Sequence, residues 1–137
     1  MALGKKIPLR QEDGAGTPSR KQLGVMAHRD LHVLEASERA ADQINELIDG
    51  PAGWQLLHVT QMRNSVQSIA ANIAEGFGRG TRGDRARLLR IARGEAEETI
   101  RHLSANFRAK RVTPKEYWSI HHLLVLIVKM LNSFLHR

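Results

Sequence analysis

The chain has 137 residues, enough for one domain with a sizeable core, and carries a net charge of +7. It contains no cysteine, which excludes disulfides and thiolate metal sites and fits a reducing cytoplasm, the location we expect. The longest unbroken apolar run, residues 123–128, is far too short to span a bilayer, and no secretory signal pattern is present, so we expect no membrane association.

The charge is unevenly distributed along the chain. Residues 30–78 carry a net charge of −5, whereas residues 79–111 carry +6, so an acidic segment directly precedes a strongly basic one. Two explanations stay open: the two segments pair with each other inside the fold, or the basic segment binds a polyanion. Pairing between the two segments cannot neutralise all of the positive charge of the chain.

Two regions are expected from the patterning. Residues 1–27 contain four glycines, two prolines and scattered charges without a sustained period, which predicts a flexible basic tail. Residues 28–137 are expected to form one helical domain. Its first helix begins near Asp30 and ends at Gly50-Pro51, because apolar residues recur at helical spacing between these points and the opposite side is acidic.

The second predicted helix extends from about Trp54 to Glu75. Its apolar stripe consists of Met62, Val66, Ile69 and Ile73, and alanines beside the stripe allow a neighbouring helix to approach closely. Gly76 is expected as the left-handed residue that ends this helix, because glycine has no Cβ to oppose that conformation.

Two further helices complete the domain. Asp84 is the expected N-cap of the third, which runs to about Lys110 with a buried face of Leu89, Ala92, Ala96, Leu103 and Phe107. The segment Thr113-Pro114-Lys115-Glu116 is typical of a capping box and starts a fourth helix that ends near Leu135. Because no segment alternates like a strand, we predict an all-α fold, an antiparallel up-and-down four-helix bundle.

A glycine-rich connection lies between the second and third helices. Gly78-Arg79-Gly80-Thr81-Arg82-Gly83 matches the letters of a dinucleotide-binding fingerprint, but such a fingerprint follows a strand, and here a helix precedes it. The tripeptide 82–84 also spells a cell-adhesion motif, in a chain with no sign of secretion. What remains is a helix N-terminus beside arginines, an arrangement that attracts phosphate.

The third helix carries a row of arginines away from its apolar stripe. Guanidinium groups bind phosphate with two parallel hydrogen bonds, so the row favours contact with the backbone of RNA or DNA over reading of bases. A solvated charged face is the alternative explanation. The candidate nucleic-acid-binding residues are Arg79, Arg82, Arg85, Arg87, Arg90, Arg93, Arg101 and Arg108.

The fourth helix is apolar on more than one side, which indicates a homo-oligomer. One seam, containing Ile120, Leu124 and Ile127, suffices for the core of a bundle. A second row, Leu123, Leu126 and Met130, needs a covering surface. Another copy of the chain is the natural one, and a deep position in the core of the bundle is the alternative.

No catalytic pattern emerges. His28 and His32 stand four residues apart without a third ligand, and no metalloprotease motif, serine elbow or carboxylate cluster is present. We therefore expect a protein that is not an enzyme and has no metal or cofactor.

The second helix carries a resemblance to a known family. Residues 61–76, QMRNSVQSIAANIAEG, followed by Gly78-Arg79, resemble the hallmark of the four-helix-bundle family also called 23S rRNA intervening sequence proteins, whose relatives include the accessory variability determinant of diversity-generating retroelements. The resemblance implies a basic homopentamer and, for the retroelement relatives, binding to nucleic acid and a reverse transcriptase. Gly94-Glu95 departs from the Gly-Ser that the family often shows. The motif residues Ser68, Asn72, Glu75 and Gly76 are expected to be structural.

Two functional hypotheses follow. The first is a non-catalytic nucleic-acid-binding accessory protein, a basic homo-oligomeric bundle that assists the reverse transcriptase of a diversity-generating retroelement. The second is a protein–protein scaffold of the 23S rRNA intervening sequence type with no direct role in binding nucleic acid.

Overall fold

The computed structural model describes residues 28–136, and every regular element within them is helical. In chain order these are α2 (His28–Asp49), the short 3-10 helix η2 (Gly53–Gln55), α3 (Val59–Gly78), α4 (Arg82–Arg108) and α5 (Pro114–Leu135). The predicted tail, residues 1–27, lies outside the described residues.

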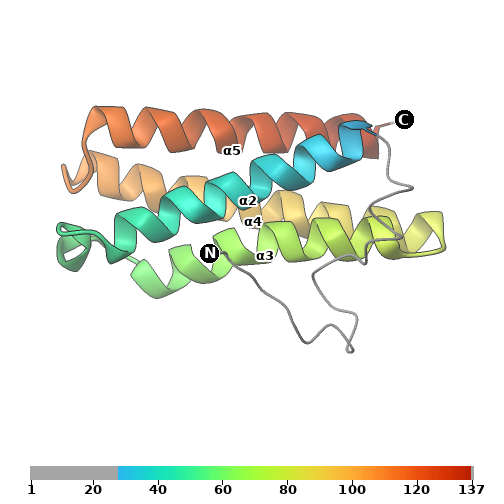
Figure 1. Cartoon of the computed structure of the whole chain (residues 1–137), viewed down its shortest axis with the longest axis horizontal. Coiled ribbons are helices and arrows are strands. Elements are labelled where there is room, and N and C mark those ends of the chain that lie inside the picture. The colour runs from blue at the N-terminus through green and yellow to red at the C-terminus, as the bar shows by residue number, and fades with distance from the viewer. Residues whose placement is uncertain (1–27, 137) are drawn as a thin grey trace.

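The four long helices form an antiparallel up-and-down bundle, as predicted. The α2–α3 and α4–α5 connections lie at one end of the molecule and the α3–α4 turn at the other (Figure 1). Helix packing joins α3 to α4, α4 to α5, α2 to α3 and α2 to α5. Since each helix has two neighbours in this ring, acidic α2 and basic α4 lie diagonally across the bundle.

The core consists of the apolar stripes that the helical spacing predicts. Met62, Val66, Ile69 and Ile73 of α3 are all 0% exposed. The apolar residues predicted for the buried face of the third helix and the first seam of the fourth are also buried, apart from half-buried Phe107. Phe107 stacks on Tyr117 of α5 with ring centroids 4.1 Å apart. The capping box at the start of α5 is confirmed, because Thr113 and Glu116 exchange side-chain-to-backbone hydrogen bonds of 3.1 and 2.9 Å.

The predicted start of the second helix is wrong by five residues, because α3 begins at Val59 rather than Trp54. The side chain of Asn106, on α4, is fully buried and accepts a hydrogen bond from Leu57 N–H at 2.7 Å and donates one to Leu57 C=O at 3.0 Å. These are the backbone groups that a continuous helix would use internally, so the amide of Asn106 ends the helical path at this point.

The predicted role of Gly76 as a left-handed terminator is also wrong. Gly76 is a buried residue inside α3, which continues to Gly78. A Cβ at this position would lie 3.3 Å from Leu89 Cδ2 and 3.4 Å from Leu88 Cβ, both on α4. The glycine is therefore needed for the close approach of two helices, not for a turn.

Replacing Gly76 by valine should lower the free energy of unfolding by about 1–3 kcal/mol, because the branched side chain enters space that Leu88 and Leu89 already fill. Urea unfolding followed by circular dichroism measures the change. Gly94→Val is the matched control, because Gly94 lies within α4 and a Cβ there meets nothing within 4 Å. The control should be neutral or slightly stabilising, since valine is the better helix former. Equal losses in both variants would contradict the packing role.

Candidate nucleic-acid interface

The N-cap of α4 is Thr81, and the prediction of Asp84 for this position is wrong. The Thr81 hydroxyl accepts a hydrogen bond from the backbone N–H of Asp84 at 3.2 Å. Asp84 lies instead in the first turn, where a carboxylate favours the positive end of the helix dipole. Both residue types cap helices well. The helix begins earlier than predicted because only residues 79–81 separate it from α3.

The rotational position of α4 separates its apolar and basic sides. Leu89, Ala92, Ala96 and Leu103 are buried against the other helices. The exposed side carries most of the predicted arginines, at positions set by the 3.6-residue turn of the helix. The arginines that the structure exposes are Arg79, Arg82, Arg85, Arg87, Arg90, Arg101 and Arg108.

Three of the eight predicted arginines already have partners within the bundle. Arg79 forms an ion pair with Glu75 one helical turn away. Arg85 lies over the ring of Phe77, 5.6 Å from its centroid. Arg93 is half-buried and donates a 2.7 Å hydrogen bond to Asn132 Oδ1 of α5. Arg93 therefore ties α4 to α5, which weakens its assignment as a nucleic-acid contact.

The remaining five predicted arginines form no ion pair with any described residue. Within residues 28–136, no ion pair involves Arg82, Arg87, Arg90, Arg101 or Arg108. In the same part of the chain, the exposed Glu97 of α4 forms no ion pair with its arginine neighbours. We call these five residues the arginine face of α4. An exposed row of unpaired guanidinium groups is suited to a chain of phosphates.

Cations at the opposite end of the bundle were not among the predicted site residues. Arg111 donates a 2.8 Å hydrogen bond to the carbonyl of Gln55, and Gln55 returns one of 3.2 Å to the carbonyl of Arg111. Lys110 beside it is exposed, as is Trp54 on η2. The sequence places Lys110 and Arg111 in the basic segment, but the hydrogen bonds that join Arg111 to Gln55, the residue after Trp54, depend on the tertiary fold.

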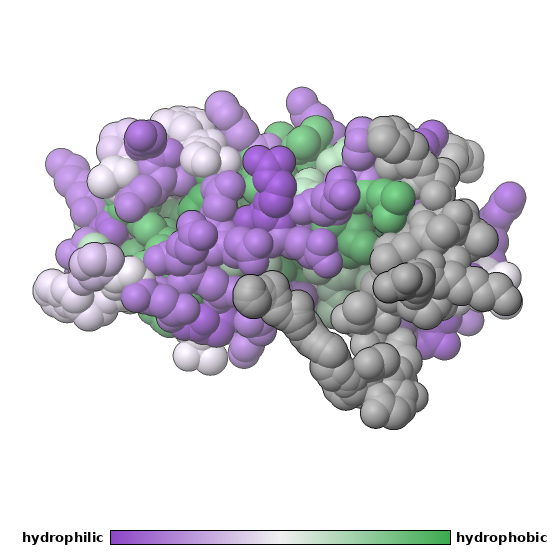
Figure 2. Space-filling view, in the orientation of Figure 1, coloured by the Kyte–Doolittle hydropathy of each residue, from purple (hydrophilic) through white to green (hydrophobic). Residues whose placement is uncertain are grey.

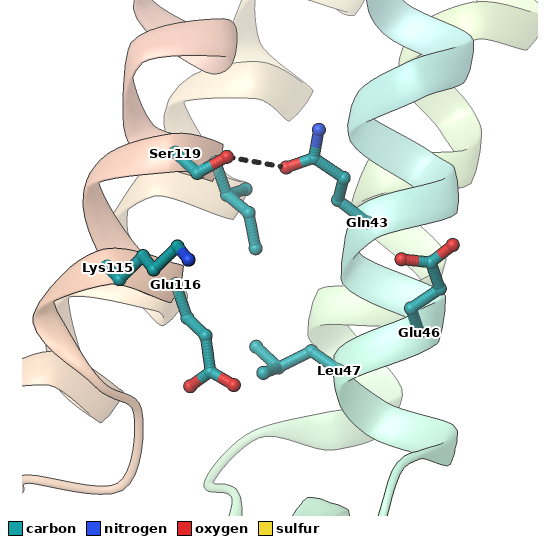
Figure 3. Close-up of a pocket in the computed structure, with 7 residues that line it drawn as sticks. Gln43, Glu46, Leu47, Lys115, Glu116 and Ser119 are labelled. Atoms are coloured by element: carbon teal, nitrogen blue, oxygen red, sulfur yellow. Dashed lines mark hydrogen bonds between the residues drawn. The ribbon is translucent and has the colours of Figure 1, made fainter.

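Two surface hollows differ in their chemistry. A groove of about 420 Å³ between α2 and α5 is lined by Glu46, Glu116 and Lys115, with Ser119 donating a 3.1 Å hydrogen bond to Gln43 (Figure 3). Two carboxylates beside one ammonium do not favour a polyanion. A second hollow, of about 400 Å³ at the start of α4, has Arg82 and Arg85 at its edge. Nowhere in residues 28–136 do three or more potential metal ligands come together.

The three residues of the predicted oligomer row on α5 differ in their exposure. Leu123 is 7% exposed and belongs to the core of its own bundle, so it is removed from any contact with another copy. Met130 is half-buried against the core, whereas Leu126 and Trp118 are each 46% exposed. Hydrophobic patches interrupt the hydrophilic surface toward α5, at the upper side of the view in Figure 2. Within the described residues, α5 is the one helix long and apolar enough to cross a bilayer by length and composition.

The motif residues of α3 make local contacts, as expected for a structural role. Asn72 donates hydrogen bonds to the carbonyl and the hydroxyl of Ser68, at 2.8 and 2.9 Å. Nearby, a buried hydrogen bond of 2.7 Å joins the hydroxyls of Ser65 and Thr99 between α3 and α4. These residues bond within the bundle and are not arranged around a ligand.

Glu95 of α4 lies beside this polar layer. Partial burial raises the pKa of the Glu95 carboxyl above its ordinary value of 4.5, and the carboxylate of Glu98 raises it further. A hydrogen bond with Ser68 acts in the opposite direction, because it favours the charged form. The ionised side chain is therefore a small burden on the folded state.

Fold and surface together define a helical bundle protein with one strongly basic helix and no cluster of metal ligands among its described residues. The family model of the 23S rRNA-intervening sequence proteins matches residues 29–133. The chain belongs to this family.

A solved structure agrees with the assignment. It is a crystal structure of a protein with unknown function from the S23 ribosomal protein family from Bacteroides thetaiotaomicron. It is 29% identical to this chain, covers 80% of it and 99% of its own length, and superimposes with a TM-score of 0.72. The search of curated proteins found no match.

Replacing Glu95 by glutamine should raise the free energy of unfolding at pH 7, by less than about 1 kcal/mol because solvent screens this half-exposed site. The raised folded-state pKa means that the ionised group costs stability at neutral pH. This cost disappears below pH 4.5, where the carboxyl is protonated in both states. The gain should therefore shrink as the pH falls toward 4.5.

Urea unfolding of wild type and variant at a series of pH values measures this difference. Glu97→Gln is the matched control, because Glu97 is exposed on the same helix and the charge change is identical. A gain of the same size and pH dependence in the control would show that net charge, not the setting of Glu95, is responsible.

Proposed function

We propose that this protein is a non-catalytic nucleic-acid-binding protein that acts as a homo-oligomer. The observation that carries the proposal is the arginine face of α4, where five exposed guanidinium groups have no ion-pair partner among residues 28–136. A surface of this kind attracts phosphates strongly and without regard to base sequence.

The position of α4 in the bundle supports the proposal. The acidic residues Glu35, Asp42 and Glu46 are exposed on α2, which is diagonal to α4 rather than next to it. The acidic segment therefore leaves the arginine face uncovered, and the positive potential extends into solvent.

Self-association would follow from α5. Trp118 and Leu126 are each 46% exposed on this helix, and half-buried Val125 and Met130 extend the apolar surface. Covering this surface with another copy would bring several arginine faces together, and multivalency would then raise affinity for a long polyanion. The copy number of five is what the family resemblance implies.

The partner we propose is the reverse transcriptase of a diversity-generating retroelement, with the bundle helping to hold its template RNA or cDNA. Support for this step comes from the motif of α3, residues 61–76, which resembles the hallmark of a family whose relatives include the retroelement accessory proteins. Co-purification with a reverse transcriptase encoded nearby tests it. The competing function is a protein–protein scaffold.

Changing Arg87, Arg90 and Arg101 together to alanine should weaken binding to fluorescent RNA and DNA and make it less dependent on salt. The slope of log affinity against log salt falls by about 0.7–0.9 for each phosphate that the protein no longer neutralises, so a decrease of about 2–3 is expected. Fluorescence anisotropy across a salt series measures the slope.

The matched control changes Arg39, Lys115 and Lys129 to alanine, which removes the same charge from exposed positions on α2 and α5. It should keep most of the affinity and the slope. Equal losses in both variants would show that binding depends on net charge alone. If wild type does not bind at low salt, the nucleic-acid-binding function is excluded and the protein–protein scaffold is the function that remains.

Changing Trp118 and Leu126 together to glutamine should reduce the mass of the protein in solution to that of a smaller assembly or a monomer. The expected cause is a weaker apolar interface between copies. Light scattering after size exclusion measures the mass. Ile91→Gln is the control, since Ile91 is 40% exposed on α4 and lies outside the α5 surface. An unchanged mass for the α5 variant would contradict this interface.

A further inference from the structure

Trp54 is unusually exposed for its size. Its side chain is 85% accessible, whereas the other exposed large hydrophobic side chains in the described residues, Trp118, Leu126 and Ile91, reach 46% at most. An indole left in water contributes little to folding. A role in binding gives the ring a reason to remain outside.

The backbone that carries Trp54 is firmly held. Gly53 N–H donates to Gly50 C=O at 3.1 Å, and Leu56 N–H donates to Gly53 C=O at the same distance. Gly53 itself is buried so tightly that a Cβ would lie 1.8 Å from the carbonyl oxygen of Ile48. The turn is therefore built around a glycine that no other residue can replace without movement of the backbone.

A second anchor joins this turn to α4 and the α4–α5 connection. The buried amide of Asn106 binds both backbone groups of Leu57, and Arg111 and Gln55 exchange hydrogen bonds through each other's carbonyls. Segments about 50 residues apart in sequence are thus fixed side by side at one end of the bundle (Figure 1). Trp54 is presented from a preorganised support, so little entropy is lost when a ligand stacks on it.

The charge beside Trp54 is positive. The guanidinium of Arg111 is bound to a neutral carbonyl, that of Gln55, so its charge is not neutralised by that contact. Lys110 and Arg108 precede it and are exposed, without an ion pair in residues 28–136. Of the acids nearby in the fold, Asp49 is paired with Arg63 at 2.9 Å, whereas Glu116 accepts only from the neutral Thr113 N–H at 2.9 Å and keeps its charge.

We propose that Trp54, with Arg108, Lys110 and Arg111, forms a binding site for single-stranded nucleic acid, in which an unpaired base stacks on the indole and adjacent phosphates contact the cations. The site rests on the proposed function and specifies its ligand. A duplex keeps its bases stacked on each other, so only an unpaired base offers its face to the ring. Arg108 also belongs to the arginine face, so a strand can follow α4 to this end.

The test compares Trp54→Ala with wild type in the full-length protein. The probes are a fluorescent single-stranded RNA of mixed sequence and a duplex of the same length. Single-strand binding should weaken by roughly 5- to 150-fold, the loss typical of one stacked base, with duplex binding unchanged. Trp54→Phe, which keeps an aromatic face, should retain most of the affinity. Thermal unfolding checks that the exposed substitutions leave the fold intact.

The outcomes separate this site from the wider function. If Trp54→Ala binds both probes like wild type, the stacking site is wrong while binding through the arginine face stands. An equal loss on both probes would also overturn it, because a stacked base requires a difference between strands. If wild type binds neither probe, the stacking site and the proposed function both fail.

Discussion

The close contact between α3 and α4 is the constraint on which the rest of the molecule depends. Gly76 lies against Leu88 and Leu89, and farther along the pair the hydroxyls of Ser65 and Thr99 are 2.7 Å apart. A glycine contact and a directional hydrogen bond together leave α4 little freedom to rotate or slide. The rotation of α4 decides which side chains face solvent, so a surface arginine such as Arg90 owes its position to small buried groups on the opposite side of the helix.

The two ends of α4 make different structural contacts. Near its start, Thr81 caps the helix and Arg85 lies over Phe77, while near its end the buried Asn106 fixes the α2–α3 connection. The buried Asn106 amide is well satisfied, with its bonds to Leu57 and a further 2.9 Å bond to the carbonyl of His102. A buried polar group that is fully bonded specifies one arrangement of the chain. Residues of α4 thus fix the path of the α2–α3 connection at one end of the bundle and supply the positive charge along the helix.

The sequence predicts the helices well because their signals are local. Apolar spacing identifies the stripe from Met62 to Ile73, and the Thr113–Glu116 box gives the start of α5 without knowledge of the fold.

The failures concern contacts between distant residues. Gly76 has the sequence appearance of a helix terminator, and only Leu89, 13 positions later, reveals why it is a glycine. Leu123 appears surplus to one apolar seam, but the ring of four helices buries it in the core of its own bundle, while Leu126 of the same row stays exposed. The basic segment is visible in the sequence. Only the structure shows that Arg79, Arg85 and Arg93 contact other residues of the bundle, whereas the remaining arginines of the segment have no ion-pair partner among the described residues.

The family motif and the arginine face have different roles in the molecule. Ser68, Asn72, Glu75 and Gly76 bond locally or pack between helices, so in this chain the motif residues serve the bundle. Membership of the 23S rRNA-intervening sequence proteins therefore determines the architecture and leaves the ligand to the surface. On that surface the unpaired guanidinium groups of α4 and the exposed ring of Trp54 are features that folding does not require. Because neither feature contributes to the core, a ligand that uses both charge and an aromatic face is the most economical explanation for their presence on one side and one end of the same bundle.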